Sequence, residues 1–583
     1  MTLKFKLPIE TVDHYALSDQ ILKDLEVSSK KTDGDHKSLF DVLYNPTHPL
    51  DELVKDRITS IYTTDAEFIK QANVFIDIVT PVADAERDVI TRAYDAVKEI
   101  HDEDNFHSKY QYIEIGMFKS LNNSPHFMQM LSFYNMLSPL ITLLTPVVIV
   151  ILPFFLIRYQ GIPLSMKAYL GTIKHILRNH AIGKLAESFS SVSWDKRIYL
   201  IITVSFYILQ VYQNAVSCYR FTHNMVHIHK QLFVIRDYLH STCKRIQNTN
   251  IVVKEHSLHK FQQFAESNER CLMSVRELVA EIDCVTPLRI SIPKACQVGS
   301  VMRLYYALRH DDNIRSAMDY SFQLNSYLNA MTRIASNKKL KTVTLTDECR
   351  WETKNMKYPH HIVIKTVGNS FKLNKPMLLT GPNASGKTTL LKSAFLNTLL
   401  SQQIGRGFYD KLTMRPYDGF HCYLDIPDTS GRDSLFQAEA RRCLDVISST
   451  GDDKSRFFCV FDELYSGTNP TEAVAGAFAL TKFLSSKKNV HFVITTHFYD
   501  LCGLCEKNDV PIQNNQMGHS KSNTAKAGVN AGVDAGLDAD VDDISFTYKV
   551  KRGVSSVRGG VRVLKQIGYP KGIVDDAVSI LSH

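Results

Sequence analysis

The chain has 583 residues, a formal net charge of +8 and 44% hydrophobic residues. One hydrophobic core does not serve a chain of this length, so we expect about three to five structural units. The mild positive charge permits contact with DNA or acidic lipid without requiring either. The 11 cysteines are scattered, and the N-terminal sequence has no apolar segment. We therefore expect free thiols in a reducing compartment and no secretory signal.

The first predicted region, residues 1–110, is polar and mostly helical in pattern. Asp84–Ile100 carries Ala, Val and Ile on one stripe and charged residues on the other. This spacing predicts an amphipathic helix that packs against neighbouring helices. The region contains no recognisable set of catalytic side chains.

Two long uncharged runs mark the second predicted region, residues 111–220. Met136–Ile157 is almost wholly apolar, and Ile198–Tyr219 is rich in aromatic and β-branched residues. Each run is long enough to cross a bilayer, so we predict a transmembrane hairpin over 136–157 and 198–219. The alternative is that the two runs form unusually apolar helices that are buried in a helical domain or in a dimer contact.

Two observations count against the hairpin. Pro139, Pro146 and Pro153 interrupt the first run, although prolines are tolerated in membrane spans. The loop between the runs is also more basic than either flank. The positive-inside rule places that loop in the cytosol, whereas a hairpin places it on the opposite side of the membrane from the rest of the chain.

Long amphipathic helices are the natural interpretation of the third region, residues 221–340. From about residue 341 to 583 the pattern changes to short β-rich runs, including Val343–Leu345 and His361–Thr366, interleaved with helices. This alternation predicts an α/β nucleotide-binding domain. Within it, Asn508–Asp543 contains a Gly-, Ala- and Asp-rich repeat of period four, which we expect to be a disordered surface insertion.

The sequence MLLTGPNASGKTT, residues 377–389, contains the pattern G-x-x-x-x-G-K-[ST] after an apolar run. The residues that follow have helical spacing, so we predict a strand, a phosphate-binding loop and a helix. Glycines let the backbone N–H groups face one anion, while Lys387 adds charge and Thr388 can offer a hydroxyl to Mg²⁺. The predicted ATP contacts from this loop are Gly381, Pro382, Asn383, Ala384, Ser385, Gly386, Lys387, Thr388 and Thr389.

Two later apolar runs end in polar side chains. Phe457–Glu463 ends in Asp462, which can hold the Mg²⁺ shell, and Glu463, which can orient or deprotonate the attacking water. Val490–Thr496 is followed by His497, at a strand end where a side chain can touch the γ-phosphate. We predict Thr388 and Asp462 as metal ligands, and Glu463 and His497 as catalytic residues.

From about Lys357 to the C-terminus the chain resembles the MutS ATPases of DNA mismatch repair and their relatives. The loop GPNASGKTT is similar to the family's phosphate loop, and Ser430–Phe436 with Glu439 resembles its SGRSTF signature and following glutamate. The later matching segments are Asp462-Glu463 with Gly467-Thr468-Asn469, then Thr495-Thr496-His497, and a closing segment that includes Phe546, Tyr548 and Gly553.

The resemblance implies an ABC-type P-loop ATPase domain after a mostly α-helical lever region, and a homodimer formed through the ATPase domain. It also implies ATP and Mg²⁺ as cofactors, DNA as a partner, a catalytic role for Asn383, and contact between Ser430 and the nucleotide of the other subunit. The chain departs from the family where Asp433 replaces a hydroxyl residue. It also lacks room before the lever for a mismatch-reading domain.

We therefore expect a dimeric, membrane-associated ATPase that couples its nucleotide state to movement of helical arms, with the ATPase domain on the cytosolic side. The first alternative is a soluble, cytoplasmic or nuclear homologue that binds DNA structures in mismatch repair or recombination. The second is a membrane tethering protein with an ABC-type ATPase.

Overall fold

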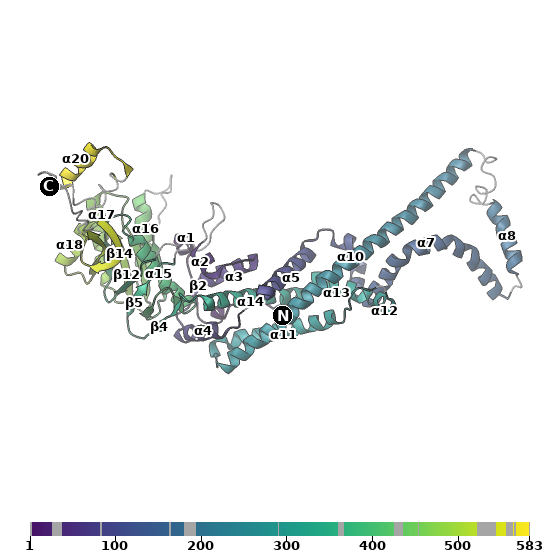
Figure 1. The fold of residues 1–583 in the computed structure, drawn as a ribbon, viewed down its shortest axis with the longest axis horizontal. Coiled ribbons are helices and arrows are strands. Elements are labelled where there is room, and N and C mark those ends of the chain that lie inside the picture. Colours follow the sequence, from purple (N-terminus) through teal and green to yellow (C-terminus); the bar gives the residue numbers. More distant parts are fainter. Residues whose placement is uncertain are drawn as a thin grey trace, which may run out of the picture. The chain divides into compact units, whose positions relative to one another are not determined.

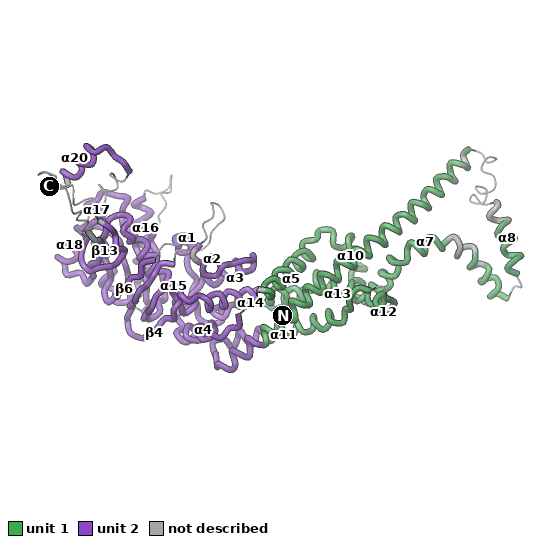
Figure 2. The backbone as a smooth tube through the Cα atoms, viewed as in Figure 1, with its two compact units in different colours: residues 1–4, 83–247, 269–322 green, residues 5–82, 248–268, 323–583 purple. Residues whose placement is uncertain are grey.

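The computed structural model describes two compact units (Figure 2). Residues 1–4, 83–247 and 269–322 form unit 1, and residues 5–82, 248–268 and 323–583 form unit 2. The four regions predicted from the sequence remain a prediction. The described residues are 3–25, 38–81, 84–161, 165–179, 194–289, 291–359, 366–424, 435–452, 454–521, 544–555, 564 and 567–581.

The described part of unit 1 is helical (Figure 1). The amphipathic helix predicted near residue 84 is confirmed as α5, Asp84–Asp102. Several of the helices continue past the boundary of the unit. The helices are α5, α6 (Phe106–Tyr110), η2 (Gly116–Asn123), α7 (Pro125–Tyr159), α8 (Met166–Asn179), α10 (Trp194–Glu255), α11 (Gln262–Asp283), α12 (Ile292–Ala295), α13 (Val298–His310) and α14 (Asp312–Ser336). Those that continue past the boundary are α10, α11 and α14.

The base of α7 packs closely against α13. The Gln129 amide donates to the carbonyl of Ala295 at 2.7 Å and accepts from the N–H of Gly299 at 2.8 Å. A Cβ on Gly299 would lie 2.4 Å from both the backbone N of Gln129 and the carbonyl oxygen of Pro125. Only glycine permits this approach, because any side chain at residue 299 would overlap the backbone of α7.

Helices α7 and α10 contact each other in antiparallel order. The Cys218 thiol lies 3.4 Å from the carbonyl of Met136, and the Asn214 amide donates to the Thr142 hydroxyl at 2.6 Å. The Tyr207 hydroxyl donates to the carbonyl of Thr142 at 3.3 Å. Because partner numbers fall on α10 as they rise on α7, the two helices run antiparallel where they meet, while their insertion in a membrane stays a prediction.

Side chains satisfy carbonyls that the prolines of α7 leave without a helical donor. Pro139 and Pro146 have no N–H for the carbonyls four residues earlier, those of Asn135 and Thr142. The Asn135 carbonyl accepts from the Ser138 hydroxyl at 3.2 Å, and the Thr142 carbonyl accepts from Tyr207 of α10. Helix α7 continues through its prolines as one helix and is curved in Figure 1.

Two helices in the described residues are long and apolar enough to cross a membrane. The stretches are Pro125–Thr145 in α7, which overlaps the predicted run 136–157, and Arg197–Glu255 in α10. Only 17% of the most apolar window of the first stretch, and 0% of that of the second, is buried in the protein. Core helices would be mostly buried, so these helices differ from the core of unit 1.

Unit 2 begins with short elements that pack on its α/β domain. The side chains of Gln402 and Gln403 donate to the carbonyls of Thr63 and Thr59, at 3.1 and 2.8 Å. These bonds fix the N-terminal segment to helix α15, Lys387–Gln403. The elements are η1 (Pro8–Thr11), β1 (Tyr15–Ala16), α1 (Asp19–Asp24), α2 (Leu39–Tyr44), α3 (Pro49–Thr59), β2 (Ile61–Tyr62), α4 (Ala66–Ile78) and η4 (His259–Phe261).

The centre of unit 2 is a mixed six-stranded sheet with the order β10-β11-β12-β7-β13-β14. The first five strands are parallel, and β14 is antiparallel to β13. The strands predicted before the phosphate loop, before Glu463 and before His497 are confirmed as β7, β11 and β12. They are consecutive in the sheet, with β12 in the middle. The strands are β7 (Met377–Thr380), β10 (Gly419–Tyr423), β11 (Phe457–Asp462), β12 (Val490–Thr496), β13 (Gln513–Lys521) and β14 (Ile544–Arg552).

Helices cover this sheet, so its central strands are buried along their length. Every residue of β7 and β12 is buried, as expected for parallel strands with both faces covered. The predicted helix after the loop is confirmed as α15. The other helices of the domain are α16 (Leu435–Ser449), α17 (Pro470–Ser485), α18 (Tyr499–Lys507) and α20 (Lys571–Leu581).

Unit 2 also contains a smaller four-stranded sheet, with the order β4-β9-β5-β6, whose strands come from residues 344–414. Trp351 of this sheet is fully buried, and its indole N–H donates to the Thr398 hydroxyl of α15 at 2.9 Å. The strands are β4 (Thr344–Leu345), β5 (Trp351–Met356), β6 (Asn369–Lys372) and β9 (Lys411–Met414), and a further pair is β3 (Lys341–Thr342) with β8 (Arg406–Gly407).

Two sequence-based expectations need comment. Most of the predicted run His361–Thr366, namely residues 361–365, lies outside the described residues. Gln513–Lys521, assigned from the sequence to the low-complexity segment 508–543, instead forms β13. It pairs with β7 on one side and β14 on the other, and residues 522–543 lie outside the described residues.

Candidate active site

The predicted phosphate loop connects β7 to α15. Gly386, the residue before the helix, has φ +94°, in the left-handed region that glycine favours. A Cβ at this position would also lie 3.1 Å from the Tyr548 ring. Glycine therefore serves both the turn and the close packing of the loop against β14.

Lys387 is buried and turned back onto the loop. Its Nζ donates to the carbonyls of Gly381 and Pro382 at 3.0 and 3.3 Å, and lies 3.0 Å from Nε2 of His497. Burial lowers the pKa of Lys387, while the charges of Glu463 and Asp462 act to raise it. The ammonium is thus held by neutral acceptors at the junction of β7 and α15, where an anionic ligand could replace them.

Asp462 lies at the end of β11, between two hydroxyl groups. The Thr388 hydroxyl donates to its Oδ2 at 2.7 Å, and the Thr495 hydroxyl donates to its Oδ1. Asp462 and Thr495 are register partners on adjacent strands, which explains the second bond. The Thr388 hydroxyl and the Asp462 carboxylate form a pair of hard oxygen ligands of the type Mg²⁺ prefers, so the predicted metal ligands fit that ion.

Glu463 follows directly and is held at the strand end. Its φ is +52°, and its N–H donates to the Thr495 carbonyl and hydroxyl at 3.2 and 3.1 Å. Its carboxylate lies 2.7 Å from Nε2 of His497, and this hydrogen bond lowers the pKa of Glu463 more than burial raises it. The carboxylate therefore stays ionised while it faces the loop.

A cavity of about 490 Å³ opens beside these groups. Its size is in the range of small-molecule sites. Loop residues and Glu463 line one part of it, and Tyr358 and Tyr548 add aromatic side chains. The sequence indicates Tyr548 only as part of the closing segment that resembles the MutS family, and nothing in it points to Tyr358. An aromatic residue after β5 gave no signal of its own, because only the folded sheet brings it to the loop.

Two polar groups near the cavity bear on ligand binding. The Asn369 amide donates to the Tyr548 carbonyl at 3.0 Å and accepts from the Val550 N–H at 2.8 Å, which fixes β14 at the rim. The buried Ser385 hydroxyl has no hydrogen-bond partner among the described residues. An acceptor in the loop, such as a phosphate oxygen, would satisfy it.

Glu439 of α16 supports the turn that follows Glu463. Its buried carboxylate accepts from the N–H and hydroxyl of Ser466 at 3.2 and 3.1 Å, and from the N–H of Gly467 at 3.3 Å. These bonds tie α16 to the Gly467-Thr468-Asn469 segment. Ser430, the predicted contact to a second subunit, lies outside the described residues.

Residues 377–583 match the family model described as MutS domain V. The match begins at β7 and includes the loop, Asp462, Glu463 and His497. The chain is also similar to the Endonuclease MutS2 of Lactobacillus acidophilus, with 24% identity over 261 residues, which is 44% of this chain and 30% of the relative. Residues 377–583 form a divergent MutS-family domain.

Other relatives match similar lengths of the chain. The DNA mismatch repair protein MutS of Persephonella marina is 26% identical over 237 residues, 39% of this chain and 25% of the relative. The Endonuclease MutS2 of Finegoldia magna is 26% identical over 282 residues, 47% of this chain and 31% of the relative. The similarity spans about a third or less of the length of these relatives.

Proposed function

We propose that this chain is a Mg²⁺-dependent ATP hydrolase. The observation that carries the proposal is the convergence of Lys387, Asp462 and Glu463 beside one cavity, at the carboxyl ends of the parallel strands β7 and β11, which β12 joins. Ligands of parallel α/β sheets bind at this edge. Mg²⁺, held by Thr388 and Asp462, would neutralise charge on the phosphates.

The residues of the chain divide the work between binding and water activation. Lys387 would leave the carbonyls of Gly381 and Pro382 for the β- and γ-phosphates, because a phosphate is the stronger acceptor. The loop N–H groups and the Ser385 hydroxyl would donate to the same phosphates. Glu463, oriented by His497, would then align the attacking water and receive its proton.

A dimer and DNA binding form the second part of the proposal. The relatives are named as mismatch repair proteins and MutS2 endonucleases, which supports DNA as a partner. We propose that two ATPase domains pair so that Ser430 of one chain contacts the nucleotide bound by the other. ATP binding and hydrolysis would then change the state of the helical arms.

The third part is membrane insertion of the α7/α10 hairpin, with the ATPase domain on the cytosolic side. Exposed apolar side chains cover both helices, among them Leu140, Leu152 and Phe206 at 54%, 52% and 66% exposure. Hydrogen bonds between the helices, and those made to proline-freed carbonyls, satisfy polar groups that lipid cannot satisfy. A soluble DNA-binding protein would need another partner for this surface.

Two measurements test the proposal. Purified full-length chain should hydrolyse ATP only with Mg²⁺, and Lys387→Met should abolish nucleotide binding. Hydrolysis that is equal with EDTA would reject the metal-dependent mechanism. In a density gradient the full chain should float with vesicles, and protein that stays at the bottom would reject the membrane hairpin while leaving the ATPase proposal intact.

A further inference from the structure

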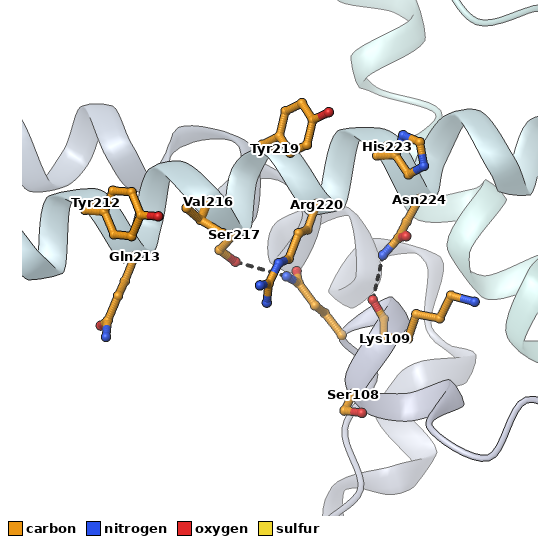
Figure 3. A pocket seen from close by; sticks show the side chains of 11 residues that line it. Ser108, Lys109, Tyr212, Gln213, Val216, Ser217, Tyr219, Arg220, His223 and Asn224 are labelled. Atoms are coloured by element: carbon orange, nitrogen blue, oxygen red, sulfur yellow. Dashed lines mark hydrogen bonds between the residues drawn. The ribbon is translucent and has the colours of Figure 1, made fainter.

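A second cavity, of about 680 Å³, lies in unit 1 between α10 and the end of α6 (Figure 3). The α10 side supplies Tyr212, Ser217 and Arg220, and the α6 side supplies Lys109 and Gln111. Neither the nucleotide site nor the family resemblance involves these residues. Among the described residues that line the cavity, none is acidic.

Two hydrogen bonds between the walls hold the cavity in shape. The Asn224 amide donates to the Lys109 carbonyl at 2.6 Å, and the Gln111 amide donates to the Ser217 hydroxyl at 3.0 Å, as the dashed lines in Figure 3 show. Gln111 has φ +61° at the end of α6, so the chain turns sharply there. Its side-chain oxygen is buried without a hydrogen-bond partner among the described residues.

Arg220 gives the cavity its unopposed positive charge. In Figure 3 its guanidinium points from α10 toward the segment that carries Lys109. Among the described residues, Arg220 has no ion pair or side-chain hydrogen bond. Lys109 instead pairs with Glu103. A planar guanidinium without a carboxylate partner suits a phosphate, which it can bind through two N–H groups.

The place of Arg220 in the sequence indicates what carries that phosphate. It is the first charged residue after the uncharged run Ile198–Tyr219, which at ~1.5 Å per residue spans the ~30 Å core of a bilayer. Tyr219, 73% exposed, directly precedes it, and Tyr is enriched at membrane interfaces. At the other end of the run, Arg197 lies 5.1 Å from the Trp194 ring, so aromatic and cationic residues mark both ends.

We propose that this cavity binds the phosphate of an anionic phospholipid headgroup, with Arg220 as its principal contact. The inference rests on the proposed membrane insertion of α7 and α10. Arg220 binds the phosphodiester, while Tyr219, the last residue of the uncharged run, lies at the level of the headgroups. The unpartnered oxygen of Gln111 can accept from a headgroup hydroxyl or amine. DNA phosphate is the rival, but the exposed apolar surface directly before Arg220 favours lipid.

The experiment uses the full chain in detergent with short-chain lipids. Dioctanoyl phosphatidylglycerol should raise the melting temperature of the wild type, and dioctanoyl phosphatidylcholine should raise it less. Arg220→Gln should bind the anionic lipid about fivefold more weakly. Arg236→Gln is the matched control, because it removes one arginine charge of α10 outside the cavity, a half-buried one that pairs with Asp237. It should behave as wild type.

The remaining outcomes separate the possibilities. Flotation of both Arg220→Gln and wild type with vesicles, with equal affinity for the anionic lipid, would overturn the headgroup site and leave the membrane proposal standing. Failure of the wild type to float would reject both. Equal stabilisation by inorganic phosphate would make the cavity a free-phosphate site. A loss of duplex DNA binding in Arg220→Gln, with lipid binding unchanged, would assign the cavity to DNA.

Discussion

The Nζ of Lys387 and the Nε2 of His497 lie 3.0 Å apart, and the same Nε2 lies 2.7 Å from the Glu463 carboxylate. A lysine ammonium can only donate, so Nε2 must be bare to accept from it, yet Nε2 must carry a proton to bond Glu463. One nitrogen cannot satisfy both contacts at once. A phosphate that draws Lys387 away would leave His497 free to donate to Glu463, so nucleotide binding and orientation of the base are linked.

Replacement of Glu463 by Gln tests its role as base. The amide cannot take a proton from water, so ATP turnover should fall by about 10²–10⁴-fold while ATP binding is retained. Turnover is measured by phosphate release and binding by a fluorescent ATP analogue. Glu348→Gln, an exposed change in the same domain, is the control. Unchanged turnover in Glu463→Gln would remove this residue from the mechanism.

The pH dependence of turnover should report the His497 contact. The hydrogen bond from His497 lowers the pKa of Glu463, and a base is active only above its pKa. In His497→Asn the pKa of Glu463 should rise toward its ordinary value. The acid limb of the kcat/KM profile should then move to higher pH. A profile with its acid limb unmoved would mean that His497 does not orient the base.

Mixed dimers test the proposed role of Ser430. Lys387→Met disables the loop of its own chain, whereas Ser430→Ala would disable the site on the partner. Each variant alone should be inactive, but a random mixture should recover about a quarter of wild-type ATPase activity, because half of the dimers contain one intact site. A mixture of Lys387→Met with Glu463→Gln should stay inactive, since both act on their own site. No recovery in the first mixture would contradict a composite site.

Glu439 should contribute to stability through the turn it supports. Its buried carboxylate accepts three hydrogen bonds from Ser466 and Gly467. Glu439→Ala leaves these donors unpaired and should lower the unfolding free energy by about 2–4 kcal/mol, with Glu439→Gln less damaging. Thermal unfolding of the two variants measures the difference. Melting temperatures equal to that of the wild type for both variants would show that the acceptor is dispensable.

Acid should destabilise the ATPase domain through His491. Burial lowers the pKa of His491 to about 4 from an ordinary 6.5, and the Arg456 charge adds to the effect. Between these values the unfolded chain takes up a proton that the folded chain does not, so the unfolding free energy falls as the pH drops from 6.5 to 4. His491→Gln should remove up to about 3 kcal/mol of this loss. The unfolding free energies of wild type and variant are measured by urea unfolding at several pH values. If they depend on pH in the same way, His491 is not the source of the acid sensitivity.

The strands and the loop could be predicted because local sequence determines them. The apolar runs end in motifs that allow few other structural interpretations, such as the GPNASGKTT loop or the Asp462-Glu463 pair. The parallel sheet brings these ends together. The sequence does not predict β13, because Gln513–Lys521 is polar and becomes a strand only by pairing with β7 and β14. The contact of Lys387 with His497, 110 residues apart, likewise requires the folded sheet.

The bond between Tyr207 and the Thr142 carbonyl has an evolutionary consequence. Pro146 leaves that carbonyl without its helical donor, and the Tyr207 hydroxyl supplies one from the other helix. If residue 146 became Ala, its N–H could donate to the Thr142 carbonyl, and the Tyr207 hydroxyl would no longer be needed as a donor. The two positions are therefore expected to vary together among related chains, with Tyr or another donor retained at 207 wherever Pro stands at 146.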